Sequence, residues 1–186
     1  NKDSVIGVPG LFKCWLKKNV GIINAVGTGV ADDKVVYSYV NRMIVYYLGE
    51  QPILNQVETY LCNDESQRKY VLKNLSKLVV KPANASGGYG IMIGPKTSSK
   101  EREEVAEKIK KNPREYIAQP LETLSTAPTI TEKNIEPRHL DLRPFVLSGK
   151  TNYVTTGGLT RVALRKGSTI VNSSQGGGSK DTLIVD

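Results

Sequence analysis

The spacing of apolar residues changes along the chain. In the first 120 residues, segments with an apolar residue every three or four positions alternate with short, continuous apolar runs. The first pattern is typical of amphipathic helices and the second of buried strands. Together, the two patterns predict helices over residues 11–18, 33–48, 64–78 and 100–112, and strands over 20–26, 79–82, 89–93 and 115–121. We expect the apolar side chains of these elements to lie in the core, including Phe12, Trp15, Leu16, Val71, Leu72, Leu75 and Leu78.

The last 50 residues are rich in strand-like segments. A polar, Thr- and Pro-rich stretch over residues 123–136 predicts a loop, and strands are predicted over 138–147, 152–156, 161–164 and 168–172. In the first of these strands, His139, Asp141 and Arg143 alternate with leucines, so their side chains share one face. Ionisable groups beside an apolar sheet are costly unless they bind a ligand or each other; the alternative is an edge strand that faces solvent.

One glycine-rich stretch, Val79 to Ile91, combines a predicted β-hairpin with a lysine at its base. Lys81 precedes Gly87, Gly88 and Gly90. Glycine backbone can close its N–H groups around an anion, and a lysine adds a point charge. This order differs from a P-loop, in which the lysine follows the glycines. The stretch therefore favours a phosphate-binding loop, although a plain turn would have the same residues.

Composition changes this picture only in part. The 186 residues suffice for one domain or two small ones, and the net charge of +8 favours anionic partners such as nucleotides or nucleic acid, unless the lysines only confer solubility. Cys14 and Cys62 show no metal spacing, so free buried thiols in a reducing cytoplasm are expected, with a disulfide as the alternative. No apolar run has the length of a membrane span and no signal peptide is visible. Since the chain lacks an initial methionine and ends on a predicted strand over residues 182–185, we expect a fragment of a longer protein.

A second glycine-rich segment follows the last of the β-rich runs. Asn172 leads into Gly176, Gly177, Gly178 and Lys180, an arrangement that suits an anion or, alternatively, a flexible linker. No nucleophile elbow, zinc spacing or heptad repeat occurs.

Several motifs in this order resemble the ATP-grasp fold, and more narrowly the circularly permuted ATP-grasp proteins, which are related to glutathionylspermidine synthase-like amide ligases. The resemblance extends over nearly the whole chain and rests on Gly27-Thr28-Gly29-Val30-Ala31-Asp32-Asp33-Lys34, Val79-Val80-Lys81-Pro82, Tyr116-Ile117-Ala118-Gln119, Asp141-Leu142-Arg143-Pro144-Phe145, Gly157-Gly158-Leu159-Thr160-Arg161-Val162 and Asn172-Ser173-Ser174-Gln175-Gly176-Gly177-Gly178-Ser179-Lys180-Asp181.

The resemblance implies an α+β fold in which two α+β subdomains grip a nucleotide. It divides the chain into the end of a preceding α/β region over residues 1–33, an ATP-grasp N-terminal subdomain with the glycine-rich lid over 34–121, and a β-rich C-terminal subdomain over 122–186.

The resemblance also implies a role for each candidate residue. ATP would be bound by Lys34, Lys81, Ser86, Gly87, Gly88, Gly90, Gln119, Leu121 and Lys180, with backbone groups of 119–121 reading adenine. Arg143 and Arg161 would be the catalytic cations at the γ-phosphate or an acyl phosphate, and Asp141 and Asn172 would bind Mg²⁺. The implied reaction activates a carboxylate as an acyl phosphate, which an amine then attacks.

One position departs from the pattern, because Ile170 stands where these enzymes usually place an acidic residue two positions before the asparagine. Mg²⁺ prefers carboxylate oxygens, so the departure weakens a two-metal site. Two functions therefore stay open: an ATP-dependent ligase that takes an unidentified carboxylate and amine, or a nucleotide- or partner-binding domain without catalysis. A nucleic-acid binder is a weaker third hypothesis, prompted by the net charge alone.

Overall fold

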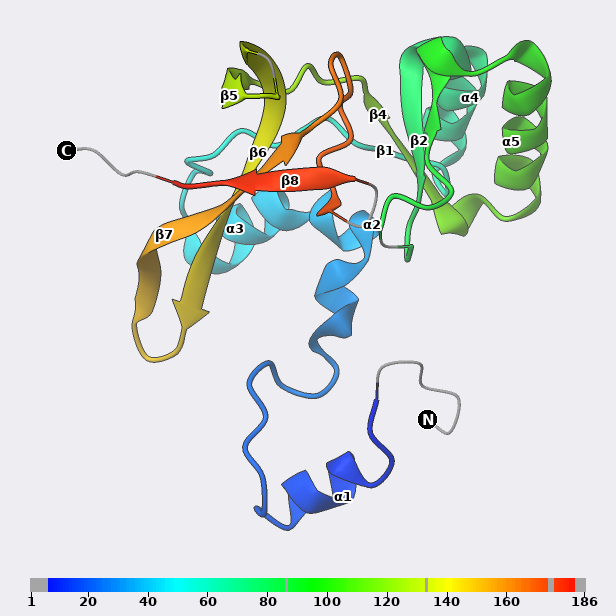
Figure 1. The fold of residues 1–186 in the computed structure, drawn as a ribbon. Coiled ribbons are helices and arrows are strands. Elements are labelled where there is room, and N and C mark those ends of the chain that lie inside the picture. Colours follow the sequence, from blue (N-terminus) through cyan, green and yellow to red (C-terminus); the bar gives the residue numbers. More distant parts are fainter. Residues whose placement is uncertain (1–6, 86, 133, 174–175, 183–186) are drawn as a thin grey trace.

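The computed structural model describes residues 7–85, 87–132, 134–173 and 176–182, which form helices and two four-stranded antiparallel sheets (Figure 1). The first sheet lies within residues 60–120 and the second within residues 126–180. This mixture of separate helices and antiparallel sheets confirms the α+β class. The division of the chain at residues 33 and 121 stays a prediction.

The first sheet has the strand order β1-β4-β2-β3. Its strands are β1 (Tyr60–Leu61), β2 (Leu78–Pro82), β3 (Met92–Ile93) and β4 (Tyr116–Pro120). Val79 pairs with Ile93 and Val80 with Met92, so the predicted hairpin around the glycine-rich loop forms, with a shorter second strand than expected.

Two helices pack on the first sheet, α4 (Glu65–Lys73) and α5 (Ser99–Lys111). Asp64 caps α4 and a capping box of Ser98 and Glu101 begins α5, as the residue types favour. Short 3₁₀ turns at Leu75–Lys77, Gly94–Lys96 and Pro113–Glu115 join these elements. The buried core of this half consists of Cys62, Val71, Leu75, Leu78, Val80, Met92, Ile109 and Ala118.

The second sheet has the order β5-β6-β7-β8. Its strands are β5 (Thr126–Ile130), β6 (Ile135–Ser148), β7 (Asn152–Ala163) and β8 (Gly177–Lys180). The Lys180 ammonium on the edge strand β8 donates a hydrogen bond to the Pro128 carbonyl on the other edge strand, β5, and so links the two edges of the sheet.

The chain before the first sheet contains α1 (Leu11–Leu16), a 3₁₀ turn (Thr28–Asp32), α2 (Lys34–Tyr37) and α3 (Val40–Leu48). Figure 1 shows α1 well away from both sheets. Phe12 and Leu16 are exposed, so the prediction that they are core residues is wrong. The helix predicted to run from residue 33 to 48 is divided between α2 and α3.

Two predicted strand or loop assignments are wrong, and two predicted strands are joined into one. Residues 20–26 form no strand, because the chain turns at Asn24, which has φ +69°, and leaves Ile23 exposed. The expected loop over 123–136 contains β5 and the start of β6, since its β-branched residues find a pairing strand. The strands expected over 152–156 and 161–164 are parts of one continuous strand, β7.

The second glycine-rich segment also differs from expectation. Residues 168–172 form no strand, and Gly177 begins β8 instead of lying in an anion-binding loop. A Cβ at Gly177 would lie 2.2 Å from the Val171 carbonyl oxygen, so glycine is needed there for close backbone packing. The terminal strand predicted over 182–185 lies mostly outside the described residues.

Both cysteines are free, but only Cys62 is buried, whereas Cys14 is exposed. Burial raises the pKa of the Cys62 thiol to about 11, which makes it an unreactive core residue. Within the described part of the chain, no helix is long and apolar enough to cross a membrane.

Candidate functional site

Two lysines from distant parts of the sequence meet at the base of the glycine-rich loop. Lys34 opens α2, and its backbone N–H donates to the Ala83 carbonyl at 3.1 Å. Its ammonium donates to the carbonyl oxygens of Ala85 at 2.5 Å and Ala83 at 3.4 Å. Lys34 therefore binds the segment that connects β2 to the glycines.

Lys81 reaches the same region from β2. Its ammonium donates to the Gln119 Oε1 at 2.6 Å, and the Gln119 Nε2 donates to the Thr59 hydroxyl at 2.8 Å. Gln119 lies on the neighbouring strand β4, diagonal to Lys81, whose direct partner is Ile117. Since Gln119 is only 7% exposed, its amide holds the Lys81 ammonium in a defined place.

Both lysines are half-buried without a carboxylate partner. Among the described residues, no ion pair includes Lys34 or Lys81, and their hydrogen bonds go to neutral oxygens. Burial, and after it the positive charge of Lys34, holds the pKa of Lys81 below its usual range. The charge of Lys34 thus acts on Lys81, so an anion bound between the two ammonium groups would be stabilised by both.

An ion pair fixes Lys34 relative to the first sheet. The Asp33 carboxylate caps α2 through the Val35 N–H at 2.8 Å and accepts a hydrogen bond from the Arg114 guanidinium at 2.8 Å. Arg114 belongs to the turn before β4, and its hydrogen bond is the main cause of the lowered pKa of Asp33. Sequence patterns did not indicate Arg114 or Thr59, because both contacts join residues at least 60 positions apart.

The loop itself has the backbone that its glycines allow. Gly87, Gly88 and Gly90 all have positive φ, and a Cβ at Gly90 would lie 2.9 Å from the Pro82 Cγ. Tyr89 is exposed between them. Ser86, predicted to bind phosphate, lies outside the described residues.

The second sheet holds the predicted catalytic and metal-binding residues. Asp141 on β6 and Arg161 on β7 are direct partners, and the guanidinium binds both carboxylate oxygens, with Nε donating to Oδ1 at 2.9 Å. This hydrogen bonding is the largest cause of the lowered pKa of Asp141, to which the charge of Arg143 also contributes. The pair is partly buried, whereas Arg143 is exposed.

The remaining polar residues of this sheet have structural partners. The Nδ1 of His139 lies 2.8 Å from the Leu124 carbonyl oxygen, so His139 does not join the Asp141 pair. Lys180 binds the Pro128 carbonyl and lies 3.4 Å from the Thr129 hydroxyl.

Leu121 is exposed directly after β4, where the chain passes from the first sheet toward the second.

The donor set does not fit a resident Mg²⁺ site. Among the described residues there is no group of three or more His, Cys, Asp or Glu side chains that could hold a metal. Asp141 already accepts hydrogen bonds from the Arg161 guanidinium on both carboxylate oxygens. Ile170 supplies no ligand atom. The predicted ligands Asp141 and Asn172 thus lack the additional carboxylates that a hard cation prefers.

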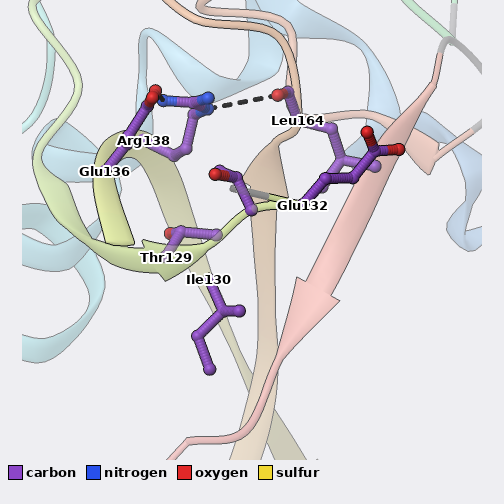
Figure 2. A pocket seen from close by; sticks show the side chains of 7 residues that line it. Thr129, Ile130, Glu132, Glu136, Arg138 and Leu164 are labelled. Atoms are coloured by element: carbon purple, nitrogen blue, oxygen red, sulfur yellow. Dashed lines mark hydrogen bonds and ion pairs between the residues drawn. The ribbon is translucent and has the colours of Figure 1, made fainter. Parts of the chain in front are cut away.

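A cavity of ≈490 Å³ lies elsewhere, on the β5–β6 hairpin (Figure 2). The Arg138 guanidinium there donates to Glu136 at 2.7 Å and to the Leu164 carbonyl at 3.1 Å, so it fastens the hairpin to the end of β7. The residues that line this cavity include none of the predicted nucleotide-site residues. Glu132 also lines the cavity.

Comparisons with known proteins agree with the resemblance that the motifs suggested. The family model for circularly permuted ATP-grasp type 2 proteins matches residues 1–163. An uncharacterized protein of Synechocystis is 58% identical over 184 residues, which cover 98% of this chain and 38% of the relative. An uncharacterized protein of Mycobacterium tuberculosis is 52% identical over 98% of this chain and 33% of its own length.

A third relative, from Frankia casuarinae, is named "Putative glutamate--cysteine ligase 2-2" and is 52% identical over 96% of this chain and 21% of its own length. The chain thus spans roughly a fifth to two fifths of these relatives. The match of the family model over most of its residues shows that the chain belongs to the circularly permuted ATP-grasp type 2 family.

Proposed function

We propose that this chain is the ATP-binding core of an ATP-dependent ligase that joins a carboxylate to an amine. The observation that carries the proposal is the pair of half-buried ammonium groups of Lys34 and Lys81 beside the glycine-rich loop, whose hydrogen bonds within the described residues go to neutral oxygens. A buried positive charge without a counter-ion is costly in the free protein. A polyphosphate removes this cost on binding, because its oxygens form charge-assisted hydrogen bonds to both ammonium groups.

The family and the names of relatives support the ligase reaction. Two Frankia relatives, 52% and 49% identical to this chain, carry the name of a glutamate–cysteine ligase. Since the chain covers only 21% and 20% of these proteins, their names do not assign substrates to it.

The proposed mechanism has two balanced steps. A substrate carboxylate oxygen attacks the γ-phosphorus of ATP, the bond to the bridging oxygen breaks, and ADP leaves from an acyl phosphate. The amine nitrogen then attacks the acyl carbon, the bond to the phosphate oxygen breaks, and inorganic phosphate and a proton leave from the amide. Neither step needs a protein nucleophile, because phosphoryl transfer depends on positioning and charge stabilisation.

The residues of both sheets have distinct parts in this proposal. Lys34 and Lys81 bind the phosphates, and Gly87, Gly88 and Gly90 close the loop over them. Arg161 and Arg143 stabilise charge on the transferred phosphoryl group, with Asp141 as the residue that positions the Arg161 guanidinium. Neither step uses a resident metal.

Calorimetric titration of ATP into the chain tests the proposal. Replacement of Lys81 by methionine keeps the side-chain length and removes one charged donor, which is worth about 1.5–3 kcal/mol. We expect ATP affinity to fall by roughly 10- to 100-fold. Lys111→Met is the matched control, because Lys111 is an exposed residue at the end of α5. Unchanged affinity in Lys81→Met, or equal losses in both variants, would refute the assignment.

A non-catalytic nucleotide-binding domain is the second candidate. The observation in its favour is the donor set around Asp141, which lacks further carboxylates in the described part of the chain and has Ile170 at the expected acidic position. This function predicts ATP binding that is the same with Mg²⁺ and with excess chelator. The ligase proposal instead predicts that Mg²⁺ strengthens binding, because the substrate enters as its magnesium complex.

A further inference from the structure

The segment before the first sheet has no core of its own. No residue between positions 7 and 61 is buried, whereas the buried residues of the first sheet begin at Cys62. Stable folding of an apolar segment requires burial of its surface. The apolar contacts that stabilise the rest of the chain therefore do not explain the folded conformation of this segment.

Five highly exposed apolar or aromatic side chains lie in the C-terminal half of α3 and the residues after it. Exposure reaches 81% for Tyr46, 76% for Tyr47, 63% for Leu48, 95% for Ile53 and 82% for Leu54. We call these five residues the α3 patch. The two tyrosine rings contact each other edge to face, with centroids 4.9 Å apart. Near the start of α3, Val40 and Met43 are 39% and 38% exposed, so the side chains at the C-terminal end of the helix are the more exposed ones.

The composition around the α3 patch is that of a protein interface. Between Val35 and Val57 the only charged residues are Arg42 and Glu50, although 24% of the whole chain is charged. Four of the nine tyrosines lie in this stretch. Depletion of charge with enrichment of tyrosine distinguishes the centre of protein interfaces from other surface. A helix that binds a membrane surface would carry several lysines or arginines on its polar face, and α3 carries one.

The relatives indicate which protein covers this surface. The matched region makes up 38%, 33% and 21% of the Synechocystis, Mycobacterium and Frankia relatives, so most of each polypeptide lies outside it. We propose that the α3 patch is an interface for another domain of the same, longer polypeptide, which contributes apolar side chains against Tyr46, Tyr47 and Ile53. The proposal does not depend on nucleotide binding.

Hydrogen–deuterium exchange of residues 40–57 tests this interface. The exchange is measured in the chain alone and in the chain joined to the sequences that flank the matching region of the Synechocystis relative. We expect exchange in the longer protein to be at least tenfold slower across the α3 patch. Addition of the flanking region as a separate polypeptide gives the same readout if the joined protein does not fold.

Two serine variants supply the control. Ile53 in the α3 patch and Ile130 on β5 are both highly exposed, at 95% and 85%. Ile53→Ser should restore fast exchange in the longer protein, whereas Ile130→Ser should leave the protection intact. Equal exchange with and without the flanking region, or equal effects of both variants, would overturn the proposal. Protection that grows with the concentration of the chain alone would assign the patch to a second copy instead. ATP titration of Ile53→Ser keeps this test separate from the proposed function, because its affinity should equal that of the unaltered chain.

Discussion

Replacement of Gln119 by glutamate should weaken nucleotide binding without destabilising the fold. The Gln119 Oε1 lies 2.6 Å from the Lys81 ammonium, so a carboxylate oxygen in the same place would form a direct ion pair. The Thr59 hydroxyl, which now accepts from the Gln119 amide and donates to the Val57 carbonyl at 3.0 Å, can rotate to donate to the carboxylate. The variant therefore retains the contacts around Lys81 and changes only its charge balance.

The size of the effect follows from this distance. Two unit charges 2.6 Å apart attract by about 6 kcal/mol at an effective dielectric constant of 20. Since desolvation of the new carboxylate offsets much of this attraction, the net change in folding stability should be small or favourable. The Lys81 ammonium, already neutralised, would lose most of its charge-assisted hydrogen bond to phosphate, worth about 1.5–3 kcal/mol. The expected loss of ATP affinity is roughly 10- to 100-fold.

Calorimetric titration with ATP and thermal melting together distinguish this mechanism from damage to the fold. Gln119→Glu should bind ATP as weakly as Lys81→Met and should melt at or above the temperature of the unaltered chain. Gln119→Met, which removes the hydrogen bond but adds no charge, should weaken binding less. If Gln119→Glu bound ATP as tightly as the unaltered chain, Lys81 could not be a phosphate ligand that depends on a neutral partner.

Three further outcomes are expected. Asp141→Asn should lower the unfolding free energy by about 1–2 kcal/mol in urea titrations at neutral pH. Because Arg161 lowers the pKa of Asp141, the stability that this ion pair contributes is present above the unfolded pKa and is lost as pH falls through the folded pKa. The unfolding free energies of the variant and the unaltered chain should therefore become equal in acid. Gly90→Ala should weaken ATP binding several-fold in the same calorimetric assay, because φ is +72° and the added Cβ would lie 2.9 Å from the Pro82 Cγ; an unchanged affinity would show that the loop does not contact the nucleotide. The pKa of Lys81 is lowered and only the protonated ammonium binds phosphate, so ATP affinity should decline as pH rises through that pKa. ATP binding should then be accompanied by proton uptake, which calorimetry in buffers of different ionisation enthalpy detects. Lys81→Met should abolish this proton uptake.

Sequence patterns predicted well those elements whose stabilising interactions are local or strongly periodic. The helices α4 and α5 form within or near their predicted ranges, and their starts are stabilised locally, because the Asp64 and Ser98 side chains accept hydrogen bonds from N–H groups three residues later. The prediction also succeeded for the hairpin from Val79 to Ile93, because its apolar runs are short and separated by glycines. The prediction failed for residues 20–26, which have a strand-like pattern but pair with no strand of the described residues.

The order of motifs along the chain was enough to indicate the ATP-grasp family and the α+β class, because each motif reflects a local backbone requirement that can be read in sequence. Only the tertiary structure decided which charged side chains form ion pairs and which bind neutral oxygens. It placed Lys34 and Lys81 against carbonyl and amide oxygens, and it joined Asp141 to Arg161 in an ion pair. These contacts depend on residues 20 to 51 positions apart, and the free energy of such a pair depends on burial and distance, which the spacing of residues in a sequence does not determine.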